Sequence, residues 1–305
     1  QAAELSFRKA IELNPNSIIG YANLGNMLKT IGRVSEAKKL LIKTIELNPY
    51  FVKPYHSLSK LEYDITDKKW HNYLFSETLL NKKNSKEKID IYFARSNILH
   101  KEKNYHKSAH NLQIANKIKL SLYPSECNLL INRSQTLLNE LEKNRNIENL
   151  KLSHPQSIFI VGMPRSGTTL VESILSLNKE VKDLGEVNIL EKAYLKSRQS
   201  NEKMSLSNLY IKEINRFSKK FSITSNKWLY NYQYSGIIAK EISNCKIIHC
   251  FRNPLDNILS IYRANFENGN RYTSSLVDSA KVYLDQEKIM CIYKKKFRAK
   301  IYDLN

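Results

Sequence analysis

The chain has 305 residues, enough for two domains, and its 49 basic and 29 acidic side chains give a formal net charge of +20. Such a charge first suggests a nucleic-acid partner, but the lysines are spread along the whole chain without a known nucleic-acid-binding module, so we expect no nucleic acid. No run of about 18 apolar residues occurs, which predicts no membrane span. The first residue is Gln1 rather than Met, so we expect a piece of a longer protein.

The first part of the chain repeats with a period of 34 residues. Residues 12–15 (ELNP) recur as residues 46–49, and two helical patterns separated by Gly32 lie between the two prolines. Residues 3–15 supply the second helix of an earlier repeat. Paired helices with this period are typical of tetratricopeptide repeats.

The repeat pattern weakens after Tyr63, but helical patterns continue. Ser85 is a candidate N-cap for one of them. Helices are expected at 68–83, at 88–118 as a pair, and at 124–146. We therefore expect an all-α helical repeat domain over residues 1–150.

Histidines and cysteines in this chain form no pattern typical of a metal site. His106 and His110 are spaced i, i+4 on an expected helix, but they lack an adjacent glutamate and a third ligand, so we interpret them as exposed. The cysteines form no CxxC pair, and we expect them to be reduced and buried in a cytoplasmic protein. They are Cys127, Cys245, Cys250 and Cys291.

From residue 157 onwards, strand and helix patterns alternate. Strands are expected at 157–162, 181–184, 246–251 and 299–304, and helices at 168–177, 187–199, 205–222, 233–243, 254–262 and 274–296. Alternation of this kind implies a parallel sheet with helices on its faces, and such sheets bind ligands at the carboxyl ends of their strands. We therefore expect a P-loop-like α/β domain over residues 151–305, joined to the repeats by a linker near Pro155.

The segment Gly162–Thr169 lies between an expected strand and an expected helix. Its Gly-x4-Gly-x-Thr spacing is that of a phosphate-binding loop, but Thr168 stands where an NTPase carries its lysine. Arg165 supplies an always-charged donor instead. The loop therefore predicts a site for a phosphate-like anion that is not a metal-bound triphosphate.

Two motifs give the chain a resemblance to a known family. Residues 159–172 are similar to the 5′-phosphosulfate loop of the sulfotransferases that use 3′-phosphoadenosine 5′-phosphosulfate (PAPS), and residues 247–260 are similar to the 3′-phosphate element of those enzymes. Together with the repeats, the chain most closely resembles the bacterial tetratricopeptide-repeat sulfotransferases and their relatives, the tyrosylprotein sulfotransferases. The resemblance covers essentially the whole chain.

This resemblance implies a PAPS-dependent sulfotransferase that binds PAPS and its product adenosine 3′,5′-bisphosphate (PAP) without a metal. It implies that Arg165, Ser166, Gly167, Thr168 and Thr169 bind the 5′-phosphosulfate, and that Arg252 and Ser260 bind the 3′-phosphate. It implies Glu186 as the base and Lys227 as the cation that neutralises the transferring group. Arg165 can also stabilise the charge that develops during transfer. The repeats would recruit the acceptor, or a protein or peptide partner.

The chain departs from the family at several positions. Asn226 and Leu229 stand where the family usually has Asp and Pro around the lysine, and Asn188 stands where the tyrosylprotein enzymes place an arginine. The last difference disfavours a tyrosine-peptide acceptor. Since the chain stops at Asn305, we expect the α/β domain to be truncated, with the adenine and further acceptor contacts beyond it.

Two other functions stay open at this point. One is a non-enzymatic repeat scaffold with a decayed nucleotide-binding domain, and the other is a P-loop kinase or NTPase, which Thr168 disfavours. The acceptor also stays open among protein, peptide, saccharide, lipid and small alcohol.

Overall fold

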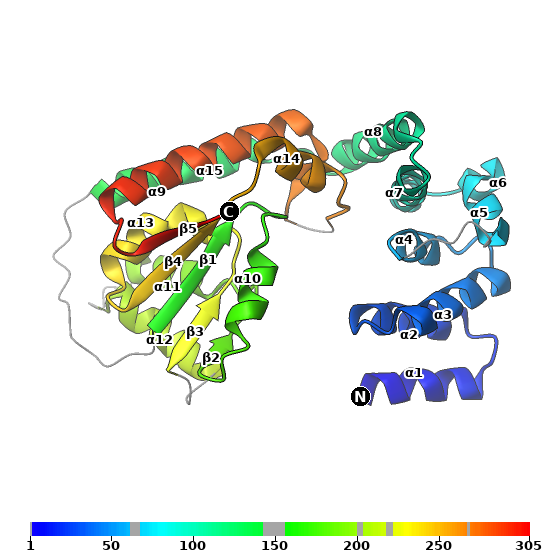
Figure 1. Ribbon diagram of the computed structural model, residues 1–305, viewed down its shortest axis with the longest axis horizontal. Helices are drawn as coiled ribbons and strands as arrows, with labels where there is room; N and C mark the ends of the chain where they lie inside the picture. The colour runs from blue at the N-terminus through cyan, green and yellow to red at the C-terminus, as the bar shows by residue number, and fades with distance from the viewer. Residues whose placement is uncertain (1, 62–67, 143–155, 200–203, 218–221, 267–268) are drawn as a thin grey trace. The chain divides into compact units, whose positions relative to one another are not determined.

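The chain folds into two compact units (Figure 1). The computed structural model describes residues 2–61, 68–142, 156–199, 204–217, 222–266 and 269–305. One unit, the repeat unit, consists of Gln1–Ser125 and Asn265–Ser274. The other, the sheet unit, consists of Glu126–Ala264 and Ser275–Asn305. The chain thus enters the repeat unit twice.

Paired helices build the repeat unit, as the 34-residue period predicts. They are α1 (Ala2–Leu13), α2 (Ile18–Thr30), α3 (Val34–Leu47), α4 (Lys53–Ser59), α5 (Lys68–Phe75), α6 (Glu77–Leu80), α7 (Ser85–Lys101) and α8 (Tyr105–Leu122), with the 3-10 turn η1 (Arg271–Ser274). Small residues let α2 and α3 approach closely, because a Cβ on Gly25 would lie 2.9 Å from the Leu41 side chain. Ala37 on α3 is fully buried.

Two details of the repeat unit differ from expectation. The expected helix at 68–83 is interrupted, because Ser76 between α5 and α6 adopts an extended backbone with ψ 144°. The N-cap of α7 is Asn84 and not Ser85. Asn84 accepts a hydrogen bond from the Glu87 N–H at 3.0 Å and donates its own N–H to the Glu87 carboxylate at 3.2 Å. This reciprocal pair satisfies two N–H groups that a Ser85 cap would leave open.

The sheet unit is an α/β structure around five parallel strands, so the predicted fold class is confirmed. The strand order is β2-β3-β1-β4-β5. The strands are β1 (Gln156–Gly162), β2 (Val181–Asp183), β3 (Ile223–Asn226), β4 (Cys245–Cys250) and β5 (Ile301–Leu304). The helices are α9 (Cys127–Glu142), α10 (Thr168–Leu175), α11 (Ile189–Gln199), α12 (Leu206–Phe217), α13 (Asn231–Glu241), α14 (Pro254–Tyr262) and α15 (Leu276–Lys296).

Strand β3 lies between β1 and β2, although the sequence pattern did not predict it. Residues Thr224–Asn226 are polar but buried. The helix expected at 205–222 ends as α12 at Phe217, and residues 218–221 lie outside the described part of the chain. Because β3 pairs with β1, its carboxyl end lies at the same edge as the end of β1.

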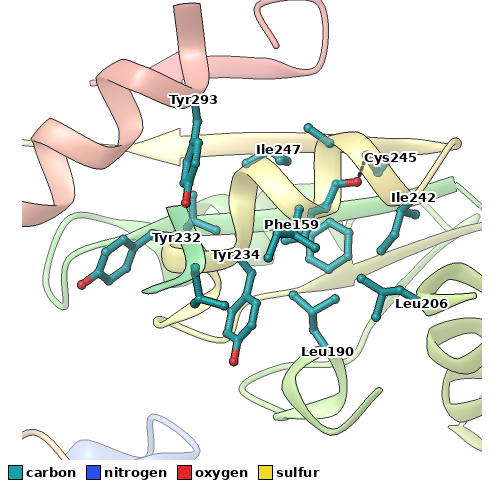
Figure 2. Packing of buried hydrophobic residues seen from close by; sticks show 14 of the residues in the cluster. Phe159, Leu190, Leu206, Tyr232, Tyr234, Ile242, Cys245, Ile247 and Tyr293 are labelled. Carbon is teal, nitrogen blue, oxygen red and sulfur yellow. Dashed lines mark hydrogen bonds between the residues drawn. The ribbon is translucent and has the colours of Figure 1, made fainter. Parts of the chain in front are cut away.

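Apolar side chains from the sheet and from α9, α11, α12, α13 and α15 form the core of this unit (Figure 2). Phe159 on β1 and Tyr293 on α15 are fully buried. Helix α9 joins the core through Leu137 and Leu141, so the sheet unit begins at Glu126, earlier than the expected limit at residue 151. That limit, part of the expected linker and the end of the helix expected at 124–146 lie outside the described residues.

The expectation that every cysteine is buried was wrong for Cys291. Cys127, Cys245 and Cys250 are buried, whereas Cys291 is exposed, because Met290 and Tyr293 take the buried face of α15. His106 and His110 are exposed, as predicted. No helix in the described part of the chain has the length and hydropathy that a membrane crossing requires.

We predict that Gly236→Ala destabilises the protein by about 1–3 kcal/mol, the usual cost of overpacking. A Cβ there would lie 2.5 Å from the Tyr293 ring and 2.7 Å from Leu141. The Tyr293 ring is held in place, because its hydroxyl donates to the Gln233 carbonyl at 2.9 Å. Urea unfolding followed by circular dichroism measures the effect.

The matched control is Gly25→Ala on α2. There the new Cβ would lie 2.9 Å from the buried Leu41 side chain, a milder overlap than at Gly236, while both substitutions gain the same helix propensity of about 1 kcal/mol, so Gly25→Ala should cost less than Gly236→Ala. Equal losses for the two variants would show that α9, α13 and α15 separate easily.

Candidate functional site

The conformation of the loop after β1 requires glycine at position 162. Gly162 has φ +155°, and a Cβ there would lie only 2.3 Å from the Cys250 carbonyl oxygen at the end of β4. The ends of these two strands therefore approach more closely than any other residue would allow. Gly167 has φ +95° and precedes α10 as its N-cap. The loop therefore leads directly into the amino end of a helix, where N–H groups without helical partners favour an anion.

Arg165, in the middle of this loop, has an unfavourable backbone conformation. Its φ is +68°, which costs about 1–2 kcal/mol for a residue other than glycine. The side chain is exposed, and its Nε donates to the Ser260 Oγ at 3.3 Å. The hydrogen bond brings together the two predicted phosphate-binding motifs, which are 95 residues apart.

Asn257 on α14 is hydrogen-bonded to the same loop, and no role was predicted for it. Its Nδ2 donates to the Pro164 carbonyl oxygen at 3.0 Å, and the residue is fully buried. Asn257 lies three residues before Ser260, so both side chains share one face of α14. This three-residue spacing from Ser260 is the feature of the sequence that could have identified Asn257.

Ser166 has a side-chain oxygen without a partner. Its Oγ is buried and forms no hydrogen bond with any described residue. Its N–H donates to the Met163 carbonyl at 3.2 Å, which keeps the loop tight. An unsatisfied buried hydroxyl costs free energy, which a hydrogen bond to an anionic ligand would recover.

Lys227, directly after β3, connects three parts of the site. Its Nζ donates to the Thr169 Oγ1 at 3.1 Å and to the Glu186 Oε1 at 2.5 Å. Its backbone N–H donates to the Gly185 carbonyl at 3.1 Å. The Lys227 side chain is only 5% exposed, whereas that of Glu186 is 54% exposed. Lys227 is therefore fixed, and Glu186 presents its carboxylate to solvent.

Asn226 explains how the turn that carries Glu186 is attached to β3. Asn226 is buried, its Nδ2 donates to the Val187 carbonyl at 3.0 Å, and its Oδ1 accepts from Asn231 Nδ2 at 2.5 Å. An aspartate could not donate to Val187. The amide therefore suits this position better than the aspartate that the resemblance led us to expect there.

A second carboxylate, that of Glu172 on α10, lies near Lys227 and was given no role from the sequence. Glu172 is 7% exposed, and its Oε1 has no hydrogen-bond partner among the described residues. Burial raises the pKa of Glu172, and the positive charge of Lys227 offsets this only in part. Glu172 lies three residues after Thr169 and therefore on the same face of α10, and this spacing could have identified it from the sequence.

Arg252 follows β4 and is exposed. Its Nη2 lies 3.9 Å from the Asp256 Oδ2, and its carbonyl accepts from the Tyr283 hydroxyl at 2.9 Å. Within the described residues, no hydrogen bond or ion pair joins Arg252 to Ser260 or to the loop. The structure thus connects Ser260 to Arg165 rather than to Arg252.

The carboxyl edge of the sheet therefore carries the cations of Arg165, Lys227 and Arg252 together with the exposed carboxylate of Glu186. Such a set can bind an anion and can accept a proton. Nowhere in the described ranges do three His, Cys, Asp or Glu side chains gather as metal ligands would.

Comparisons with known proteins agree with the folds of both the sheet unit and the repeat unit. Residues 155–305 match the model of the sulfotransferase family, and residues 6–39 match a tetratricopeptide repeat. The chain is also similar to an uncharacterized protein from Aquifex aeolicus (strain VF5), with 28% identity over 336 aligned positions. The alignment covers all of this chain, which spans 43% of the length of that relative.

We predict that Glu172→Gln stabilises the protein more at about pH 7 than at about pH 4. Since burial raises the folded-state pKa, the carboxyl causes no penalty below its ordinary pKa, and its ionisation costs stability as the pH rises through the raised value. The free energy of unfolding of the variant minus that of the wild type should therefore increase with pH. Urea titrations at both pH values measure it.

Glu180→Gln, which changes an exposed carboxylate, should show no such trend. A difference for Glu172→Gln that falls with pH would mean that the attraction to Lys227 outweighs burial.

Proposed function

We propose that this chain, whose residues 155–305 form a domain of the sulfotransferase family, transfers a sulfuryl group from PAPS to an acceptor hydroxyl. The observation that carries this proposal is the double contact of Lys227. One ammonium group touches Thr169 in the loop and Glu186 in the next turn. The proposed phosphosulfate loop, cation and base thereby form one connected set.

The loop residues fit the 5′-phosphosulfate of PAPS. The Ser166 hydroxyl has no partner within the described chain, and glycine at position 162 makes room for it, because a Cβ there would lie 2.7 Å from the Ser166 Oγ. Arg165, Ser166, Gly167, Thr168 and Thr169 would hold this group through N–H groups, hydroxyls and one guanidinium. Arg252 and Ser260 would hold the 3′-phosphate.

PAPS supplies a sulfuryl group whose leaving group is a phosphate. Glu186 would accept the proton of the acceptor hydroxyl, since its carboxylate is exposed and is kept in place by Lys227. Lys227 and Arg165 would offset the negative charge that grows on the leaving phosphate. By analogy with phosphoryl transfer, positioning and electrostatics would then contribute more than covalent catalysis.

The repeat unit would recruit the acceptor or a partner. Its match to the tetratricopeptide repeat favours a protein interaction. We also propose a cytoplasmic location, which four cysteines without a disulfide support.

We predict that PAP binds in the presence of EDTA, and that Arg252→Ala weakens this binding by about 10- to 150-fold. A charge-assisted hydrogen bond to phosphate contributes about 1.5–3 kcal/mol. Adenosine 5′-phosphosulfate lacks the 3′-phosphate and should bind the variant as well as the wild type. Calorimetry with both nucleotides tests this.

Binding that requires Mg²⁺ would argue for an NTPase-like site. Equal losses for both nucleotides would instead assign Arg252 a structural role through its ion pair with Asp256.

We predict that Glu186→Gln retains PAP affinity but lowers turnover by about 10²–10⁴-fold, the usual contribution of a general base. Glutamine keeps the shape but cannot accept the proton. The readout is transfer of labelled sulfate from PAPS to components of a cell extract. The control Glu180→Gln removes an exposed carboxylate outside the site and should leave turnover unchanged. Normal turnover of Glu186→Gln would place the base elsewhere.

A further inference from the structure

The repeat unit contains a cavity of about 580 Å³, within the range of ligand pockets. Helices α2, α4, α7 and α8 and the segment beginning at Asn265 line it. Its ammonium groups come from Lys29 on α2, Lys53 on α4, Lys60 directly after α4, Lys86 on α7 and Lys119 on α8. Among the described residues that line it, Asp90 is the only carboxylate.

Asp90 and Lys119 both form hydrogen bonds with the segment 265–266. Asp90 accepts a hydrogen bond from the Asn265 Nδ2 at 3.1 Å. The buried Lys119 donates to the Asn265 Oδ1 at 3.0 Å and to the Phe266 carbonyl, which are both uncharged oxygens. These bonds fix the wall formed by α7, α8 and residues 265–266.

Three lysines of the cavity are available to a ligand. Lys29, Lys53 and Lys86 form no ion pair with any described residue. Lys29 is half-buried, donates to the Ser57 Oγ at 3.3 Å, and has its pKa lowered by burial. A partly desolvated ammonium group gains from an opposite charge more than a fully hydrated one does.

His56 on α4 lies in the positive field of the same lysines. Its Nε2 is buried without a hydrogen-bond partner in the described chain. Burial and then the charges of Lys60, Lys29 and Lys119 lower the pKa of His56 to about 3. The cavity therefore holds a neutral imidazole with one unsatisfied nitrogen, surrounded by cations. A carboxylate bound in the cavity would offset this positive field.

We propose that this cavity binds an acidic peptide segment, with carboxylates against the lysines. Asn23 and Asn26 on α2 also line it, and their amide groups both donate and accept, as peptide groups require. The lysines come from four helices that line one concave cavity, whereas duplex nucleic acid is met by charges along a face or groove. This site belongs to the repeat unit alone and does not depend on sulfuryl transfer.

The test measures binding of a fluorescently labelled Glu-rich peptide, and of the same peptide with Gln at every Glu, to the full chain. We expect only the Glu peptide to bind, with an affinity that falls as salt rises. The triple variant Lys29→Gln, Lys53→Gln and Lys86→Gln should weaken binding about 10- to 100-fold. The control variant Lys39→Gln, Lys107→Gln and Lys117→Gln removes the same charge from exposed positions outside the cavity and should change binding less than about threefold.

Arg252→Ala should retain the peptide, because Arg252 lies in the sheet unit. Equal binding of the two peptides, equal losses for the two triple variants, or loss of the peptide in Arg252→Ala would overturn the proposal. Tighter binding of a single-stranded oligonucleotide through the same three lysines would also overturn it and assign the cavity to nucleic acid. Circular dichroism of both triple variants confirms that they are folded.

Discussion

The candidate site depends on one nearly buried ammonium group, that of Lys227. Removing such a charge from water is costly unless it is paired and hydrogen-bonded. The hydrogen bonds from the Lys227 ammonium group to Glu186 and Thr169 offset this cost, and the Lys227 backbone N–H donates to the Gly185 carbonyl. The loop after β1, the turn after β2 and the end of β3 are therefore fixed relative to one another by a single charge. A substitution that removed the acceptor oxygen at either position would leave this buried ammonium group with an unsatisfied donor and would disturb the contacts among all three segments, whereas glutamine at position 186 keeps an acceptor.

Strands β1 and β4 could be predicted because fully buried parallel strands are continuous apolar runs. Strand β3 could not, since Thr224–Asn226 are polar although they pack between β1 and β2. Their polarity has a local reason, because Asn226 holds the Val187 carbonyl and precedes Lys227. Similarly, the apolar period of α9 predicted a helix, but periodicity does not say which core a helix joins. Here α9 joins the core of the sheet.

The candidate site was predictable as far as the sequence motifs and the family resemblance reach. They selected the loop, Glu186, Lys227 and the Arg252–Ser260 element, whose roles stay predictions, and the structure joins Lys227 to Glu186 and Thr169. They did not predict that Ser260 would contact Arg165, that Asn257 would support the loop, or that Glu172 would be buried beside Lys227. These contacts depend on how α10 and α14 pack after the chain has folded, so residue types alone do not determine them.

The return of the chain into the repeat unit at Asn265–Ser274 limits how such a protein can evolve. A crossover between genes after Ser125 would separate Lys119 from Asn265 and Phe266, which are encoded 146 and 147 codons after it. The repeat unit therefore cannot be inherited as one contiguous cassette. Exchange between relatives would preserve its wall only if both segments came from the same parent, or if their contact residues changed together.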